Sequence, residues 1–403
     1  MGIGNVGRAF LLGTSALVMT SAVADADSFD ITVLTFANKT LGPAAGETGT
    51  VQAGAGLGAF DVSLPAVDIV GSGATLTNHG TITAIGTVVR ATGPISGVSV
   101  TNSGLIRTTI GFGKGVLVST GADLTGGVLN QAGATISGGV TGIDVFKTSD
   151  ISGGVDNSGT IFGGTIGINV NAPGLTSNPS DISGGILNQA GAAISGGVTG
   201  VHVDIISAIS GGIDNQGLIT GVRNQGTISR AGTAFAVTGA GADITGQGVL
   251  NEVVATISGT FAGLGVTSGA NISGGVDNSG LVKGGVIGVL VTGAVAGPGI
   301  GVLNQVGGTI SGGQFGIAVV GSASLPGGGT PSDISGGVDN SGTISGGNSG
   351  IGILSGSDIS GGVDNGGVLS GGSFGLWVAG GSDISDAGGA RGFGVRNQVG
   401  WPR

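Results

Sequence analysis

Aspartate is the residue type whose spacing could do chemistry in this chain. One set lies in Ser-Asp-Ile-Ser-Gly-Gly phrases or looser versions of them, at Asp123, Asp150, Asp181, Asp243, Asp333, Asp358 and Asp383. A second set precedes asparagine, at Asp156, Asp214, Asp277, Asp339 and Asp364. Carboxylates stacked about 4.8 Å apart repel by roughly 1 kcal/mol in water, and Ca²⁺ could relieve this. The calcium-binding pattern G-G-x-G-x-D is absent, however, because Gly-Gly-Val-Asp is too short: its aspartate comes two residues too early. We therefore interpret both sets as solvated acidic faces and predict no metal site.

A nucleophile pattern occurs once, at Gly371–Gly375, whose spacing is the G-x-S-x-G of a nucleophile elbow. The same slot in related repeats holds Thr165, Val286 or Gln314 at or beside the position of Ser373. A catalytic serine would not be expected in a slot that otherwise accepts threonine, valine and glutamine. We interpret the match as accidental.

The remaining candidates for acid–base chemistry are two histidines and a few carboxylates. His79 and His202 belong to different repeats, and the alternation around His202 directs its side chain to solvent. A pair of carboxylates can act as acid and base on a glycan, and convergence of Asp144, Lys147 and Asp204 would indicate such an enzyme. We predict no catalytic, cofactor-binding or metal-binding residue, and hence no enzyme and no cofactor. A carbohydrate-active β-helix enzyme is the alternative.

Asparagine recurs once in almost every repeat. The positions are Asn78, Asn102, Asn130, Asn157, Asn188, Asn224, Asn251, Asn278, Asn304, Asn340, Asn365 and Asn397. Asparagine tolerates the left-handed backbone of a tight corner, and stacked amides can hydrogen-bond along a rod. We therefore predict a structural ladder of these side chains. Asn215 breaks the rhythm, because it lies nine residues before Asn224, so Gly211–Arg230 is expected to form a compressed or slipped coil.

Three phrases, recurring about every 27 residues, must position these side chains. The Asn phrase is apolar-x-Asn-x-Gly-x-apolar, as in Val155–Ile161, and a sister form with one extra residue occurs at Leu129–Ile136. The Gly-Gly phrase is Gly-Gly-x-x-Gly-apolar-x-apolar, as in Gly163–Val170, and the Ser-Asp phrase follows it. Alternating apolar residues predict short strands, and glycine supplies the corners between them. The repeat predicts an all-β, right-handed, single-stranded parallel β-helix, a solenoid of about 12 coils of three short strands.

One coil cannot be stable alone, because it buries too few side chains to order its backbone. In the coil that starts at Val155 the alternation directs six side chains inward: Val155, Ile161, Ile166, Ile168, Val170 and Ile182. Stability must therefore come from stacking between coils.

Insertions mark three coils, at Asn171–Ser180, Thr292–Ile300 and Gly321–Ser332. All three follow a Gly-Gly phrase, so the sequence predicts that they leave the rod at one shared corner. Loops gathered on one face of a solenoid are frequently a binding surface. A corner that merely tolerates extra length is the other interpretation.

Composition excludes several classes of protein. The 403 residues include 95 Gly but only 9 Pro and no Gly-X-Y period, which excludes collagen, and 39% hydrophobic residues in a regular pattern argue against disorder. The net charge of −10 and the scarcity of aromatic residues argue against nucleic acid as a partner. The chain has no cysteine, so no disulfide staples it.

The N-terminal segment has the pattern of an export signal. Arg8 precedes a short apolar run, Ala9–Val18, and Ala22–Ala24 is a small-x-small cleavage candidate. We predict a signal peptide at residues 1–24, an N-terminal β cap at 25–70, and a β-helix region at 71–403. The last line of sequence, Gly394–Arg403, stops partway through another Asn coil, so we expect a fragment, a truncated gene product or a chain that another protein exports.

The signal-like start, the lack of cysteine and the Asn-Ser-Gly-Thr-Ile and Ile-Ser-Gly-Gly repeats resemble the passenger regions of bacterial autotransporters. This resemblance covers roughly residues 75–400, and the outer-membrane barrel that normally follows a passenger is missing from the sequence. It implies export to the cell surface, the outer membrane or the extracellular space, and a role as a structural scaffold or adhesin in virulence or biofilms.

The partners implied are a host or neighbouring-cell surface or a polysaccharide, together with an outer-membrane translocator encoded elsewhere. A self-assembling extracellular matrix protein is a further alternative. In that case coils would associate end to end, and concentration-dependent fibres would be observed.

Overall fold

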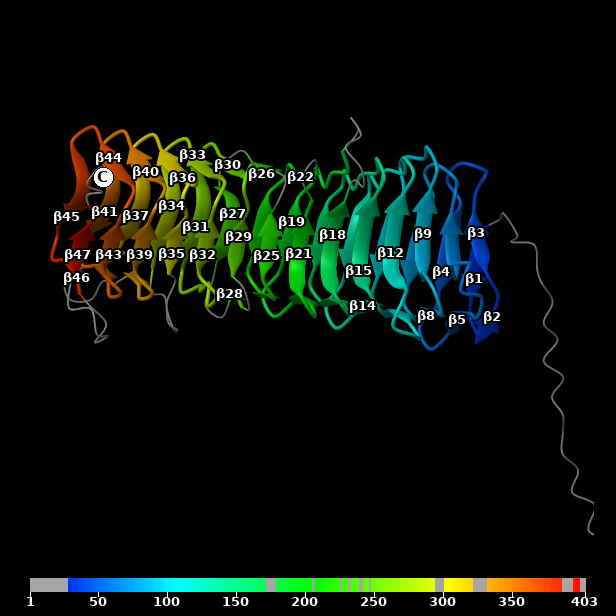
Figure 1. Cartoon of the computed structure of the whole chain (residues 1–403). Helices are drawn as coiled ribbons and strands as arrows, with labels where there is room; N and C mark the ends of the chain where they lie inside the picture. Colours follow the sequence, from blue (N-terminus) through cyan, green and yellow to red (C-terminus); the bar gives the residue numbers. More distant parts are fainter. Residues whose placement is uncertain are drawn as a thin grey trace, which may run out of the picture.

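Stacked coils of β-strands form the whole of the computed structural model, which describes residues 28–171, 179–204, 207–224, 227–230, 233–238, 242–245, 248–293, 301–321, 332–385 and 394–398. The coils build one long rod that runs from β1 to β47 (Figure 1). In this part of the chain no helix has the length and apolar character needed to span a membrane. The predicted signal peptide, residues 1–24, lies outside the described residues.

The chain passes four faces of the rod in turn, which we number I to IV. Face I is a sheet of fourteen strands: β1 (Phe29–Ile31), β4 (Thr48–Val51), β7 (Thr75–Asn78), β10 (Ser99–Asn102), β13 (Gly127–Asn130), β16 (Val155–Asn157), β19 (Ile186–Asn188), β23 (Ile213–Asn215), β27 (Thr233–Thr238), β31 (Ala262–Thr267), β34 (Ile287–Thr292), β37 (Phe315–Val320), β41 (Ser349–Leu354) and β45 (Phe374–Val378).

Face II follows face I in each coil. It consists of a nine-stranded sheet and, further along the rod, a three-stranded one: β2 (Thr35–Phe36), β5 (Gly56–Ala59), β8 (Thr81–Ala84), β11 (Leu105–Thr108), β14 (Thr135–Gly138), β17 (Thr160–Gly163), β20 (Ala193–Gly196), β24 (Leu218–Ile219) and β28 (Asp243–Ile244), then β38 (Asp333–Ile334), β42 (Asp358–Ile359) and β46 (Asp383–Ile384).

Face III is the second fourteen-stranded sheet. Its strands are β3 (Lys39–Leu41), β6 (Val67–Ile69), β9 (Val89–Thr92), β12 (Lys114–Ser119), β15 (Thr141–Phe146), β18 (Ile166–Asn171), β21 (Thr199–Val203), β25 (Val222–Asn224), β29 (Val249–Asn251), β32 (Val276–Asn278), β35 (Val302–Asn304), β39 (Val338–Asn340), β43 (Val363–Asn365) and β47 (Val395–Asn397).

Face IV closes each coil. It begins as isolated bridges between Asp123, Asp150, Asp181 and Ala208. It continues as a seven-stranded sheet: β22 (Ala208–Ile209), β26 (Thr227–Arg230), β30 (Thr256–Gly259), β33 (Leu281–Gly284), β36 (Thr309–Gly312), β40 (Thr343–Gly346) and β44 (Val368–Gly371).

The predicted parallel β-helix is confirmed, since neighbouring strands within each face pair in parallel, as β13 does with β16. From β7 onward face I has twelve strands, which agrees with the expected number of coils. Each coil has three strands plus a shorter fourth segment, because the Asn phrase supplies two strands rather than one. In the segment predicted as a cap, strands β1 to β6 join the same three faces, with Phe29 paired to Gly49 and Thr48 to Thr75.

Aliphatic side chains fill the interior of the rod. Of the six side chains expected to point inward in the coil at Val155, five are at most 2% exposed. The exception is Ile166, which is only half-buried. It opens strand β18, in register with Thr141 and Thr199, where the backbone is still turning out of the Gly-Gly corner. Alternation therefore identifies inward residues within a strand but not at its first position.

Glycine in the Asn phrase is required for two different reasons. In the sister form Gly133 has a φ of +78°, a conformation that a side chain disfavours. In the shorter form Gly159 has no such φ, but a Cβ there would lie 2.3 Å from the carbonyl oxygen of Ala134 in the preceding coil. The first glycine turns the chain, and the second lets neighbouring coils approach closely.

The order of phrases on the four faces changes once, at the slipped coil expected at Gly211–Arg230. Before it, the Asn phrase begins on face I and the Gly-Gly phrase lies on face III; after it, the two exchange places. Two Asn phrases follow one another at β23 and β25, with no Gly-Gly or Ser-Asp phrase between them. Half a repeat is therefore missing, and all later phrases are displaced by two of the four faces, or half a turn.

Candidate functional site

The ladder asparagines form two separate ladders on different faces. On face I, the side-chain amide of each donates to the amide oxygen of the next over 2.7–2.8 Å, through Asn78, Asn102, Asn130, Asn157, Asn188 and Asn215. On face III the same contact joins Asn224, Asn251, Asn278, Asn304, Asn340, Asn365 and Asn397. The expectation of one continuous ladder thus needs correction at the slipped coil. Asn188 bonds Asn215, the residue expected to break the rhythm, and Asn224 begins a new ladder.

The slip leaves polar groups without their usual partners. Asn224 lies opposite Val203 rather than another asparagine, and among the described residues its buried Oδ1 has no hydrogen-bond partner. Asn215 lies opposite Val237, and its amide donates to the backbone oxygens of Gly217 and Asp243 instead. The slip therefore costs the rod one buried unsatisfied amide oxygen, a penalty of about 1–3 kcal/mol.

The expected backbone conformation of the ladder residues is also corrected. Among the described residues, positive φ outside glycine occurs only at threonine, lysine, valine and serine, and at no asparagine. Each ladder asparagine instead ends a strand, and all but the exposed last member, Asn397, are buried, most of them 0% exposed. Asn278, for example, also donates to the backbone oxygens of Gly280 and Thr309. These amides satisfy the corner's carbonyl groups and hold adjacent coils together, so they are not available to a ligand.

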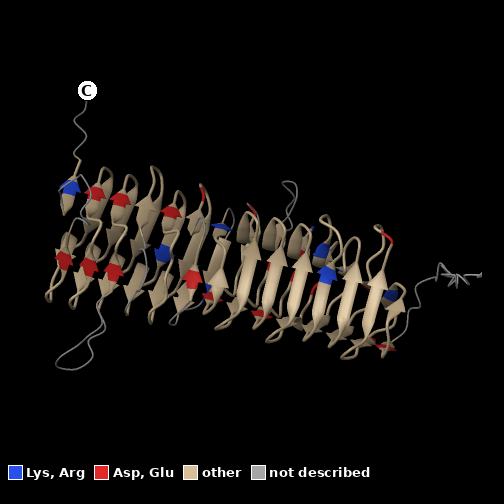
Figure 2. Cartoon of the chain, turned by 90° about the horizontal axis from the view of Figure 1, so that it is seen from below, with Lys and Arg blue, Asp and Glu red and all other residues tan. Residues whose placement is uncertain are grey.

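The Asp residues of the Ser-Asp phrases also lie on two opposite faces of the rod, one group before the slip and one after it. Asp123, Asp150 and Asp181 are bridged on face IV, whereas Asp333, Asp358 and Asp383 are paired on face II. Strands carrying acidic residues lie side by side near the C-terminal end in Figure 2. The carboxylates accept hydrogen bonds from the next coil, such as the one from Ser360 Oγ to Asp333 at 2.9 Å. These residues therefore tie successive coils together.

Two of these carboxyl groups have perturbed acidity. Burial raises the pKa of Asp150; the backbone amide of Asp181 opposes the rise, and the charges of Asp123 and Asp181 add to it. Burial likewise raises the pKa of Asp333, while hydrogen bonds from Ser360 oppose it. In the described part of the chain no group of three or more His, Asp or Glu side chains is placed to hold a metal ion.

The alternation of the two Asn-phrase forms separates some, but not all, of the second set of aspartates. On face I, Asp156 and Asp214 are separated by Leu187. On face III, Leu303 separates Asp277 from Asp339 in the same way, but Asp339 and Asp364 are paired directly. The sister form also supplies a glutamine that donates to the preceding Asp, as Gln189 does to Asp156 at 2.7 Å and Gln305 to Asp277 at 2.9 Å. Where the two forms alternate, carboxylate repulsion is reduced and Asp156 and Asp277 gain a neutral donor. Asp214 lies opposite Ala236 instead, and its buried Oδ1 has no hydrogen-bond partner within the described part of the rod.

The three insertions leave the rod at two corners rather than the single corner expected. The first follows β18 on face III, whereas the second and third follow β34 and β37 on face I. Half a turn lies between the two departure points, because the Gly-Gly phrase changed faces. The insertions themselves, at 172–178, 294–300 and 322–331, lie outside the described residues.

A polar row crosses four coils on face III and contains the most buried charge of the described rod. Lys114 pairs with Asp144, whose side chain is 3% exposed. Asn169 donates to Asp144 over 2.7 Å, and its oxygen lies 2.8 Å from Nδ1 of His202. A carboxylate only accepts, so Asn169 must present its amide to Asp144 and its oxygen to His202, which places a proton on Nδ1. The Lys114 Nζ also lies 5.0 Å from the centre of the Phe146 ring.

The three residues whose convergence would indicate a glycosidase are arranged differently. Asp144 is buried in its ion pair with Lys114. Lys147 lies over the Phe146 ring, with its Nζ 5.3 Å from the ring centre. Asp204 follows the end of β21, and its backbone amide bonds to Val170. A buried, paired carboxylate such as Asp144 cannot reach a glycosidic bond, so this row does not have the geometry of an acid–base pair acting on a glycan.

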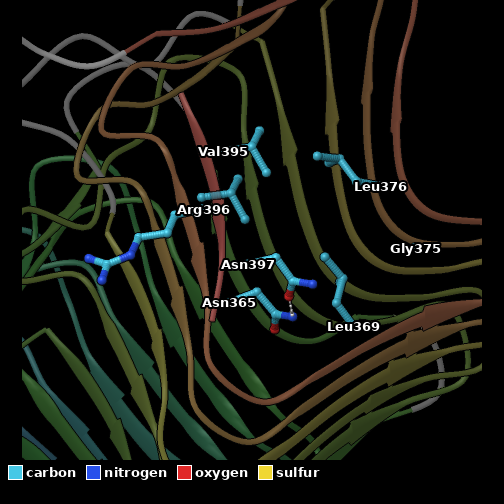
Figure 3. Close-up of a pocket in the computed structure, with 8 residues that line it drawn as sticks. Asn365, Leu369, Gly375, Leu376, Val395, Arg396 and Asn397 are labelled. Atoms are coloured by element: carbon cyan, nitrogen blue, oxygen red, sulfur yellow. Dashed lines mark hydrogen bonds between the residues drawn. The ribbon is translucent and has the colours of Figure 1, made fainter. Parts of the chain in front are cut away.

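A pocket of about 260 Å³ lies in the last described coil. It is lined by Val363, Leu369, Leu376, Val395 and neighbouring residues, together with the final pair of the ladder. Figure 3 shows Asn365 and Asn397 joined by their hydrogen bond beside Leu369, with Arg396 turned away from them. The lining residues occupy core and ladder positions, so this pocket is the interior of the coil and not a cleft in the side of the rod.

No family model matches the chain, and neither the curated proteins nor the solved structures include a significant match to it.

Proposed function

We propose that the chain is the exported passenger of an autotransporter-like system and acts on the cell surface as a structural scaffold or adhesin. The observation that carries the proposal is the construction of the rod. Every described coil is held to the next by parallel strand pairing, by an apolar core and, over most of the rod, by an asparagine ladder, and the chain has no cysteine.

Such a rod suits a cell-surface role for physical reasons. Its stability comes mainly from contacts between neighbouring coils, so most outward side chains can vary at little cost to the fold. Fourteen coils spaced by about 4.8 Å extend roughly 65 Å, which places a binding face well away from a membrane. Many of the rod's outward carboxylates accept hydrogen bonds from a neighbouring coil, which suits an acidic surface that faces water.

Export is tested on the full-length chain in its own cells. We expect the protein in the outer-membrane or extracellular fraction, accessible to added protease, with a new N-terminus near Ala24 when the purified protein is sequenced by mass spectrometry. A variant lacking residues 1–24 is the control and should remain inside the cell. Full-length protein that retains Met1 and is protected from protease in intact cells would contradict the proposal.

A further inference from the structure

Three aromatic side chains form a continuous row on the outside of face I near the C-terminal end of the rod. The ring centres of Phe315 and Trp377 are 6.2 Å apart with planes inclined by 14°, and those of Phe374 and Trp377 are 5.9 Å apart with planes inclined by 23°. Phe374 is 49% exposed, and the other two are partly exposed. The ring planes are therefore nearly parallel, and the three rings form one partly exposed aromatic cluster that spans three coils.

Small residues beneath the rings allow this arrangement. Phe315, Ser349 and Phe374 are paired in register on β37, β41 and β45, and Ser349 is fully buried between the two phenylalanines. Trp377 lies opposite Gly352, where a Cβ would come within 2.7 Å of the Phe315 ring. A larger residue at Gly352 would therefore lift that ring from the sheet.

Neutral polar side chains border the aromatic row at the corner between faces IV and I. Gln314, Asn348 and Ser373 stack there in successive coils through backbone hydrogen bonds, and each immediately precedes Phe315, Ser349 or Phe374. Strands β34, β37, β41 and β45 contain no ionisable residue. The acidic residues of these coils lie on faces II and III. An anionic ligand would meet those carboxylates, and a cationic one would bind them in preference to the neutral face.

We infer that this surface, the aromatic row of Phe315, Phe374 and Trp377 with its border of Gln314, Asn348 and Ser373, binds an uncharged oligosaccharide. Sugar rings present C–H groups on their faces and hydroxyl groups at their edges. The negative face of an aromatic ring attracts the C–H groups, and amide and hydroxyl side chains pair with the sugar hydroxyls. The inference rests on the proposed adhesin role for its biological setting.

The test uses the purified full-length chain carrying Trp401→Phe, so that Trp377 is the sole source of tryptophan fluorescence. It is titrated with the hexasaccharides of β-1,4-linked glucose, xylose and mannose, and with hexagalacturonate as an anionic comparison. We expect a saturable change in emission with at least one neutral hexasaccharide, weaker binding of its disaccharide, and no binding of hexagalacturonate.

Matched variants locate the binding. Phe374→Ala is expected to weaken the affinity about tenfold, and calorimetry should show the same for Trp377→Ala. Phe162→Ala removes a ring that is 42% exposed on β17, far from this surface, and should leave the affinity unchanged. Melting temperatures establish that each variant is folded.

Two results would overturn the inference: no neutral hexasaccharide binds, or binding occurs but Phe374→Ala and Phe162→Ala are equivalent. The experiments distinguish a failure of this inference from a failure of the proposed function. A chain that binds sugar but remains in the cytoplasm refutes export alone, whereas an exported chain that binds none of the sugars refutes this surface alone.

Discussion

The outward positions of the Gly-Gly phrase differ sharply between the two halves of the rod. Before the slip, on face III, the middle outward position carries the polar row of buried Asp144 and Asn169 and half-buried His202. After the slip, on face I, the equivalent positions carry Leu290, Ala318, Gly352 and Trp377, none of which is charged. The inward positions on either side hold only valine, isoleucine or leucine in these coils. Packing restricts the inward positions to aliphatic residues, whereas the residue type at the outward positions varies between polar, charged, small and aromatic.

The half-turn slip places these two kinds of outward residue on opposite faces of the rod. Because the Gly-Gly phrase changes faces, the polar row and the aromatic row occupy faces III and I, separated by half a coil. Without the slip both rows would share one face. One missing half-repeat therefore gives the rod two chemically distinct sides at the cost of one unsatisfied amide oxygen.

Breaking the polar row is expected to have the largest effect on stability. Lys114→Met removes the counter-ion of Asp144, whose side chain is 3% exposed, and should lower the free energy of unfolding by about 3 kcal/mol in urea denaturation. Trp377→Ala, the comparison on face I, removes a partly exposed ring and should cost less than about 1.5 kcal/mol.

Replacing both partners distinguishes the ion pair from packing. The double variant Lys114→Met, Asp144→Leu leaves no buried charge and should recover most of the lost stability. If the single variant unfolds at the same urea concentration as the parent chain, the polar row does not stabilise this half of the rod.

The two ladders predict a smaller effect that depends on position. Asn278→Ala removes an interior member, which orphans the amide of Asn251 and the oxygen of Asn304, and should cost about 2 kcal/mol. Asn224→Ala removes the first member of the same ladder, whose own Oδ1 is already unpaired, and should cost about 1 kcal/mol. Urea midpoints measure both, and equal losses would argue that Asn224 is an interior member of a single ladder.

The raised pKa of Asp333 predicts the smallest effect, a dependence of stability on pH. The folded chain holds this proton more tightly than the unfolded chain, so the contribution is fully present below the ordinary value of 3.8 and is lost as the pH rises through the folded pKa. Asp333→Asn mimics the protonated group and should therefore raise the melting temperature at pH 7. The difference from the parent should vanish near pH 3.5, and a difference that grows as the pH falls would contradict the assignment.

The sequence patterns predict the structure of each coil, but not which face of the rod each phrase occupies before and after the slip. The period, the inward Val and Ile residues and the asparagine positions all follow from local alternation and glycine corners. The exchange of faces depends on which of two adjacent phrases, at Asn215 or Asn224, stacks on the coil below. That choice is a contact between coils. The sequence feature that could have indicated the exchange of faces is the absence of a Gly-Gly phrase between Asn215 and Asn224.

The side-chain contacts of the candidate sites could not be predicted for a related reason. Alternation directs Asp144 outward, and it does point outward, but Lys114 from the preceding coil and Asn169 from the next one cover it. The aromatic row likewise brings together Phe315 and Trp377, which are two coils apart in the chain. Side chains from adjacent coils therefore determine whether an outward-facing residue is buried and which contacts it makes.

Engineered disulfides test the half-turn slip most directly, because the chain has no cysteine of its own. Leu187 is paired in register with Asp214 on face I, and His202 with Arg223 on face III. Paired strands lie about 4.8 Å apart, within disulfide range. We predict that the cysteine pairs at 187 and 214 and at 202 and 223 cross-link on oxidation, as seen on non-reducing gels, and that a pair at 187 and 223 does not. Cross-linking of 187 to 223, with none between 187 and 214, would contradict the account.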